Sequence, residues 1–180
     1  MQKKINLLPA TYKEKSLEID LRQELHLMLV GPPDTKQEII FNAIREQLLA
    51  MPDTDVRKID LTEENVESQM KTIFQELENR YHTMAELGMR TIEEYNQISA
   101  NNWHYIVVLI NYHPVTGDEI DNLICKLAQK GRAAGIHLIL ESSTTPPARI
   151  CINFPTRFEM SENEATFISY GKKCERRNLH

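Results

Sequence analysis

The chain has 180 residues, 41% of them hydrophobic and 26% charged, and a formal net charge of -5. These values are typical of one globular domain and exclude a strongly basic protein that coats nucleic acid. No apolar run approaches the ~20 residues that a membrane helix needs, and residues 1–15 carry no secretory signal. The three cysteines form no CxxC pair, so the sequence predicts neither a zinc site nor disulfides and favours a cytoplasmic location.

The first fifty residues predict a strand, a tight turn and a helix. After an N-terminal extension (residues 1–15), residues 16–21 alternate polar and apolar side chains like a half-exposed strand. Residues 26–30 form a short apolar run that ends at Gly31 and two prolines. From Thr35 the apolar spacing becomes helical, and the expected buried face comprises Ile39, Ile40, Ala43, Ile44, Leu48 and Leu49.

The middle of the chain predicts a short strand and two helices. Residues 56–60 suit a short strand. A long helix follows, for which we expect Thr62 as the N-cap, acidic residues in the first turn and Gly88 as the stop. Apolar residues recur along it every three or four positions, which is the period of a helix with one buried face. Residues 91–98 predict a shorter helix.

The strongest strand signal lies at residues 104–110, HYIVVLI. This segment is apolar on both faces, as in the centre of a parallel sheet that helices cover on both sides. A helix within residues 118–135 leads directly into a strand at 136–140, so the sequence predicts a right-handed βαβ unit.

The C-terminal part predicts one or two further strands, at residues 157–160 and 165–170, followed by a basic tail at 171–180. Residues 121–180 contain more Lys and Arg than Asp and Glu, so an acidic partner could face this part of the chain. The predicted fold class is α/β with a mostly parallel sheet, in a single domain spanning residues 1–180.

Ligands of such sheets bind at the carboxyl ends of the strands. Residues 31–38 lie between a strand and a helix N-terminus, which is the place of a phosphate-binding loop. Such a loop needs several glycines, a lysine for the terminal phosphates and a Ser or Thr for Mg²⁺. Only Gly31 is present, two prolines remove two N–H donors, and Gln37 and Glu38 occupy the lysine and Ser/Thr places. We therefore expect no ATP or Mg²⁺ cofactor and no metal site.

Lys36 stands one residue before the lysine place. One residue on a helix corresponds to a rotation of about 100°. Lys36 can therefore be a displaced phosphate lysine or, as we favour, a solvated lysine in the first turn of the helix.

The second strand end lacks the acids that phosphoryl transfer needs. An ATPase normally places one acid here for Mg²⁺ and a second to orient the attacking water. Asn111 and Tyr112 occupy these positions, and neither is an acid at neutral pH. His113 follows and could accept a proton, but a loop histidine beside a proline is the simpler interpretation.

Four sequence blocks, in this order, resemble the motor domain of the FtsK/SpoIIIE family of bacterial DNA translocases. They are ENRYHTMAELGMRTIEEYN (78–96), YIVVLI (105–110), LAQKGRAAGIHLIL (127–140) and NFPTRF (153–158). The resemblance extends from about residue 16 to about residue 160. It implies a three-layer RecA-like P-loop NTPase fold, assembly into hexameric rings around double-stranded DNA, and ATP between subunits.

The departures from the family pattern lie where ATP chemistry is expected. The family's Gly-Thr-Thr-Gly-Ser-Gly-Lys-Ser loop aligns with residues 31–38 and keeps only its first glycine. Its Asp-Glu pair aligns with Asn111 and Tyr112, and its Thr-Gln-Arg-Pro segment aligns with residues 142–145, which contain no Gln or Arg. Degenerate Walker A and Walker B motifs of this kind predict a pseudo-ATPase that acts in assembly or regulation rather than an enzyme.

The expected partners are further copies of the chain or other translocase-like subunits, and DNA contact stays open. Arg132 and Arg157 match family arginines, and with Lys172 and Lys173 they are candidates for DNA or subunit contacts. Three alternatives remain: an active DNA-translocating ATPase with an unusual nucleotide site, a non-catalytic DNA-binding module, and a degenerate ATPase domain of a secretion motor. All of these would place the chain near chromosome segregation or a related transport process.

Overall fold

The computed structural model describes residues 4–6, 18–20, 26–32, 35–113, 117–161, 164–169 and 172–178. Their elements in chain order are β1 (Lys4–Asn6), β2 (Glu18–Asp20), β3 (Leu27–Val30), α1 (Thr35–Leu49), β4 (Thr54–Asp60), α2 (Val66–Glu86), α3 (Ile92–Ile98), β5 (Tyr105–Tyr112), α4 (Asp118–Lys130), the 3₁₀ helix η1 (Gly131–Ala134), β6 (Ile136–Ser142), α5 (Ala148–Cys151), β7 (Thr156–Met160), β8 (Glu164–Ser169) and β9 (Lys172–Asn178).

The main sheet has seven strands in the order β4-β5-β6-β3-β7-β8-β9. Strands β4, β5, β6, β3 and β7 run parallel, and β8 and β9 extend the sheet in antiparallel fashion. The predicted α/β class with a mostly parallel sheet is therefore confirmed. Strands β1 and β2 pair separately in a small antiparallel sheet, and only residues 18–20 of the strand expected at 16–21 are described.

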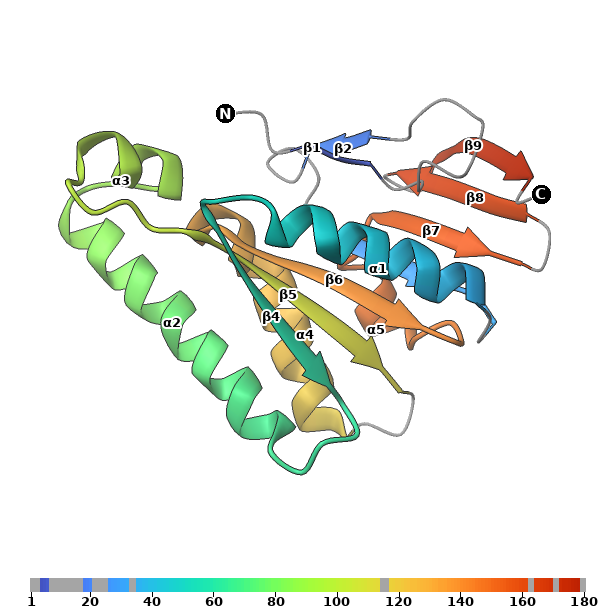
Figure 1. The fold of residues 1–180 in the computed structure, drawn as a ribbon. Coiled ribbons are helices and arrows are strands. Elements are labelled where there is room, and N and C mark those ends of the chain that lie inside the picture. The colour runs from blue at the N-terminus through green and yellow to red at the C-terminus, as the bar shows by residue number, and fades with distance from the viewer. Residues whose placement is uncertain are drawn as a thin grey trace.

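Strand β5 explains why the domain has three layers. Its residues from Tyr105 to Ile110 are all buried, so both faces of the strand must be covered. Val107 and Leu109 pack in the cluster that α1 covers, whereas Ile106, Val108 and Ile110 pack in the cluster that α2 and α4 cover. Figure 1 shows α1 crossing one face of the sheet, with α2 and α4 on the other.

Helix α1 buries a narrower face than its sequence predicts. Ile40, Ile44 and Leu48 are fully buried against the sheet, as expected. Ile39 and Leu49 are 47% and 52% exposed, so their assignment to the buried face is wrong. Only one side of α1 touches the sheet, and residues one position away from the contact line turn about 100° from it.

The N-terminus of α2 also differs from the prediction. Thr62 is not the N-cap, because α2 begins at Val66 after Asn65. Instead, Thr62 donates its backbone N–H and its hydroxyl to Asp60 Oδ1, at 3.0 and 2.7 Å. This local turn after β4 competes with the helix, as short polar side chains often do. The other end is as predicted: Gly88 has φ +69°, a left-handed conformation that ends the helix after Glu86.

The C-terminal part contains one strand more than the sequence predicts. Strands β7 and β8 match the expected segments at 157–160 and 165–170. The basic segment at its end forms β9, which pairs with β8. Its sequence, KKCERRN, has no apolar alternation, so the strand depends on backbone pairing with β8 rather than on a hydrophobic face.

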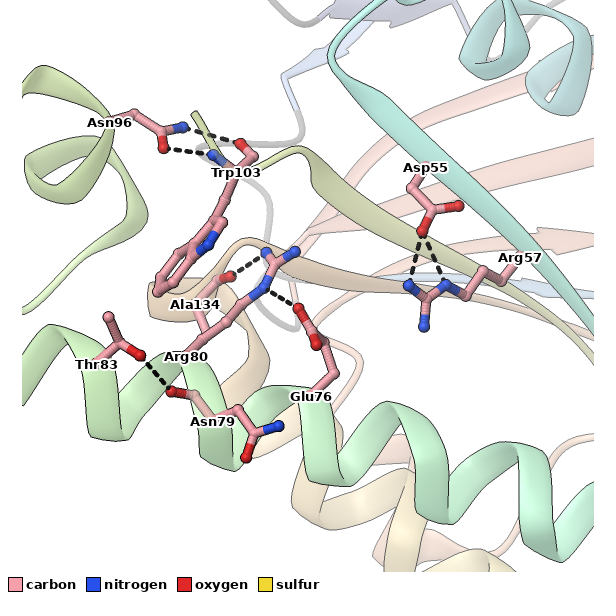
Figure 2. A network of polar contacts seen from close by, with 9 residues as sticks. All are labelled: Asp55, Arg57, Glu76, Asn79, Arg80, Thr83, Asn96, Trp103 and Ala134. Atoms are coloured by element: carbon pink, nitrogen blue, oxygen red, sulfur yellow. Dashed lines mark hydrogen bonds and ion pairs between the residues drawn. The ribbon is translucent and has the colours of Figure 1, made fainter. Parts of the chain in front are cut away.

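A buried arginine joins α2 to η1. Arg80 donates from Nη1 to the carbonyl of Ala134 at 2.8 Å and from Nε to Glu76 at 2.9 Å, and its guanidinium lies 5.3 Å from the centre of the Trp103 ring. Figure 2 also shows how the Asn96 amide fixes Trp103, by accepting from its N–H and donating to its carbonyl. These residues therefore stabilise the packing of α2, α3 and η1.

A buried histidine connects β3 to α4 and β6. His26 Nε2 lies 2.7 Å from the carbonyl of Ala128, and His26 Nδ1 accepts the N–H of Leu138 at 2.9 Å. Both ring nitrogens are used, one as donor and one as acceptor, which suits the neutral ring. Burial, together with the nearby charges of His137 and Arg132, lowers the pKa of His26 to about 3.

This pKa predicts that acid destabilises the fold before the carboxylates titrate. Between pH 6.5 and 5 the unfolded chain protonates His26 while the folded chain does not, so the free energy of unfolding falls by up to about 1.4 kcal/mol per pH unit. Urea denaturation at several pH values measures the slope. His26→Gln keeps a donor and an acceptor but does not titrate, so the slope should decrease. The control variant His82→Gln changes an exposed histidine and should have the same slope as the unmodified chain. Equal slopes in all three proteins would contradict the prediction.

Candidate functional site

The tertiary structure brings the two strand ends of interest to one edge of the sheet. Strand β6 lies between β3 and β5, so these two strands are not direct neighbours. Both are in register with the last residue of β6: Val30 pairs with Ser142 on one side and Tyr112 pairs with Ser142 on the other. Ser142 is therefore the common neighbour of the two segments in which the sequence predicts an altered site.

A cavity of about 600 Å³ opens beside α1 at this edge. Its lining combines residues of α1 with the ends of β4, β5 and β6: Gln37, Glu38, Phe41, Asn42, Arg45, Lys58, Asn111, Tyr112, His113, Glu141 and Ser143. Its size suits a small ligand. The sequence-predicted residues Gln37, Glu38, Asn111 and Tyr112 are thus brought together.

Gly31 has a packing role at the end of β3. Its N–H donates to the carbonyl of Ser142 at 3.1 Å. A Cβ atom at this position would stand 2.8 Å from Cβ of Met160 in β7, closer than side chains approach one another. The neighbouring strand therefore requires a glycine here whether or not a phosphate binds.

Gln37 points into the protein rather than to solvent. Its side chain is only 3% exposed, and its Nε2 donates to the carbonyl of Ser142 at 3.1 Å. The next residue, Glu38, is exposed and lines the cavity. The side chain of Lys36 lies outside the described residues, so its two interpretations stay predictions.

Asn111 and Tyr112 point to opposite faces of the sheet. Asn111 is half-buried and lines the cavity on the α1 side. Tyr112 is 1% exposed, belongs to the cluster beneath α2 and α4, and donates its hydroxyl to Asp121 Oδ1 at 3.2 Å. Neighbouring residues of a strand point to opposite faces, so Tyr112, at the second position of the expected acid pair, points toward α4.

Acids at the start of α4 pair with an arginine of α5. Arg149 Nη2 lies 2.7 Å from Asp121 Oδ2 and 2.6 Å from Asp118 Oδ1, and these carboxylates raise the pKa of Arg149. Asp121 is buried, so its contacts with Tyr112 and Arg149 compensate for its loss of hydration. The network joins the end of β5 to α4 and α5.

Two carboxylates line the cavity, those of Glu38 and Glu141, and only Glu38 was identified from the sequence. Glu141, near the end of β6, is half-buried, and burial followed by the negative charge of Glu38 raises its pKa, against the effect of Lys58. A usable signal was its place directly after the apolar run 136–140, at a strand's carboxyl end. Among the described residues, no group of three His, Cys, Asp or Glu could hold a metal ion.

The candidate DNA or subunit contacts fall in two places. Arg132 is exposed in η1, before β6, and lines a second cavity with Tyr81 and Glu93. Arg157 is half-buried in β7, and Ile168 of β8 is in register with both Arg157 and Lys173. The backbone positions of Arg157 and Lys173 therefore lie on one line across the strands, two strand spacings or about 10 Å apart.

Lys172 pairs with Ser169 at the start of β9, next to Lys173. Three of the four candidates therefore gather at the antiparallel end of the sheet, and Arg132 does not belong to their strand row. Across the described part of the chain, no helix has both the length and the apolar content needed to cross a membrane.

Comparison with known proteins finds relatives of this chain, although no family model matches it. It is 32% identical over 163 residues to DNA translocase FtsK of Oceanobacillus iheyensis, and 26% identical over 181 residues to DNA translocase SftA of Bacillus subtilis. Each match covers 79% of this chain but 19% of the relative, so the chain spans about a fifth of the length of these proteins.

A solved structure shares the fold. The pCW3 conjugation coupling protein TcpA, solved as a monomer with ATPγS, superposes with a TM-score of 0.79 at 18% identity, over 99% of this chain and 66% of that one. The RecA-like P-loop architecture expected from the sequence is thereby confirmed.

The packing of Gly31 gives a prediction about stability that needs no ligand. Gly31→Ala should lower the free energy of unfolding by about 1–3 kcal/mol, because the added methyl group overlaps Met160. Gly117→Ala is the matched control, since nothing lies within 4 Å of a Cβ atom there. Denaturant titration measures both variants. A Gly31→Ala protein as stable as the control would show that the contact with β7 does not require glycine.

Proposed function

Because this chain is related to the FtsK/SpoIIIE DNA translocases, we propose that it is a catalytically inactive, motor-type domain that assembles with itself or with active translocase subunits. The observation that carries the proposal is the use of Gln37. At the place of the phosphate lysine, this side chain is buried and donates to the carbonyl of Ser142. The position serves an internal contact instead of a ligand.

The residues at the edge of the sheet do not fit Mg-ATP. Pro32 has no N–H to offer a phosphate, and the N–H of Gly31 is used in the strand-end bond to the carbonyl of Ser142. Each missing charge-assisted hydrogen bond removes roughly 1.5–3 kcal/mol of binding. Glu38 and Glu141 lie in the cavity wall beside Arg45 and Lys58, so the formal charges of the wall balance and give no net attraction for a triphosphate.

Hydrolysis lacks a carboxylate at both expected positions. Asn111 is a neutral amide, so it binds Mg²⁺ more weakly than a carboxylate does. The Tyr112 hydroxyl donates to Asp121 on the face opposite the cavity, so it cannot orient a water beside a phosphate there. No step of ATP chemistry therefore follows from the described residues.

The role in assembly is supported by packing contacts from a sequence block that resembles the translocase family. Arg80 and Tyr81, from the block that resembles the family, hold η1 and the end of α4: Arg80 donates to Ala134, and the Tyr81 hydroxyl donates to Lys130 at 2.7 Å. Such contacts keep the motor-type fold without a nucleotide. A domain that keeps the shape of a subunit and loses its chemistry can occupy a subunit's place.

Calorimetry with Mg-ATP tests the inactive nucleotide site. We expect no measurable binding heat and no phosphate release, with or without double-stranded DNA, and no change in Lys36→Ala. An active FtsK-type motor domain in the same buffer serves as the positive control. Low-micromolar binding with turnover that Lys36→Ala abolishes would overturn the proposal and establish an active motor.

The assembly half is tested on the same preparation by sedimentation velocity. The chain should form oligomers alone or join those of an active FtsK-type motor domain. A strict monomer under both conditions, across a wide range of concentrations, would contradict this part of the proposal.

A second candidate function is a DNA-binding module without ATPase activity. The observation that favours it is the register of Arg157 in β7 with Lys173 in β9. The sequence of β9 contains further basic residues. Positive charges along one sheet segment suit contact with a phosphate backbone.

This candidate predicts DNA binding that weakens steeply with salt and weakens further in Arg157→Gln/Lys173→Gln, without sequence preference. Fluorescence anisotropy from about 50 mM salt upward measures it. Arg90→Gln, which changes an exposed arginine on another face, is the control. No binding at the lowest salt would exclude the DNA-binding candidate.

A further inference from the structure

One carbonyl oxygen at the edge of the sheet accepts two hydrogen bonds from the segment after β3. The carbonyl of Ser142 lies 3.1 Å from the N–H of Gly31 and 3.1 Å from Nε2 of Gln37. Gly31 follows β3, Gln37 lies in the first turn of α1, and Ser142 ends β6. The two donors thus connect three elements at a single acceptor.

This junction is closed to water. Gln37 and Ser142 are both buried, and the position of a Cβ atom on Gly31 would be 3.5 Å from Gln37 Oε1, so the amide group packs directly over the glycine. A buried donor or acceptor that loses its partner is not compensated by solvent. The contact therefore favours the arrangement in which Gln37 points inward by about fivefold, the equivalent of about 1 kcal/mol.

We propose that Gln37 is an internal latch that holds the end of β3 and the start of α1 against β6 without any ligand. The side-chain amide of Gln37 makes this contact within the chain itself. This inference rests on the proposed function, because a bound phosphate would compete for the same N–H groups.

Ser142, the acceptor of the latch, is also connected to the turn after β6 and to the last residue of β5. The Ser142 hydroxyl donates to the carbonyl of Thr144 at 2.6 Å, which fixes the turn after β6. On the other side, Tyr112 is in register with Ser142 and is tied to α4 through Asp121.

Hydrogen exchange measured by NMR tests the latch. Gln37→Met keeps the volume of the side chain and removes the amide, so we expect the Gly31 and Thr144 amides to exchange about fivefold faster, the equivalent of about 1 kcal/mol. Gln47→Met is the matched control, because Gln47 lies on the same helix and donates to the carbonyl of Ala43. It should leave both rates unchanged.

Repeating the hydrogen-exchange measurement with Mg-ATP distinguishes a failure of the latch from a failure of the proposed function. Unchanged rates in Gln37→Met would overturn the latch and leave the inactive site untouched. Strong protection of the Gly31 amide by Mg-ATP in the unmodified chain would overturn the proposed function, whatever the variants do. Faster exchange in Gln37→Met alone, with no effect of Mg-ATP, supports both.

Discussion

The architecture depends on β5, an interior strand of the sheet that is apolar on both faces. Because β5 exposes no polar face from Tyr105 to Ile110, it is stable only with helices on both sides. α1 supplies one cover and α2 with α4 the other. Parallel strands joined by these helices place their carboxyl ends at one edge, and this edge is where segments distant in sequence meet.

At that edge, internal side chains make hydrogen bonds with one another and with the backbone. Gln37 donates to Ser142, and Tyr112 donates to Asp121, which in turn pairs with Arg149. Each contact satisfies a buried polar group, so the site is closed by the chain's own hydrogen bonds. A cavity lies beside them, and its wall carries Arg45 and Lys58 as well as Glu38 and Glu141.

Fold and chemistry use different residues in this domain, which is why one can persist without the other. The blocks that resemble the translocases act mainly in packing: Arg80 lies against Trp103 and binds the carbonyl of Ala134, and Tyr81 binds that of Lys130. None of these contacts involves the edge where a nucleotide would bind. The core and the order of strands therefore do not depend on Gln37 or Asn111 at the two strand ends.

The sequence by itself determined most elements, the parallel sheet and the residues at both altered strand ends, because apolar periodicity and glycine or proline breaks are local signals. It did not determine that Ile39 is exposed, that Thr62 serves a turn, or that residues 172–178 form a strand. Those outcomes depend on which neighbour a segment meets. The contact between Gln37 and Ser142 joins residues 105 positions apart, and only the placement of β6 beside β3 creates it.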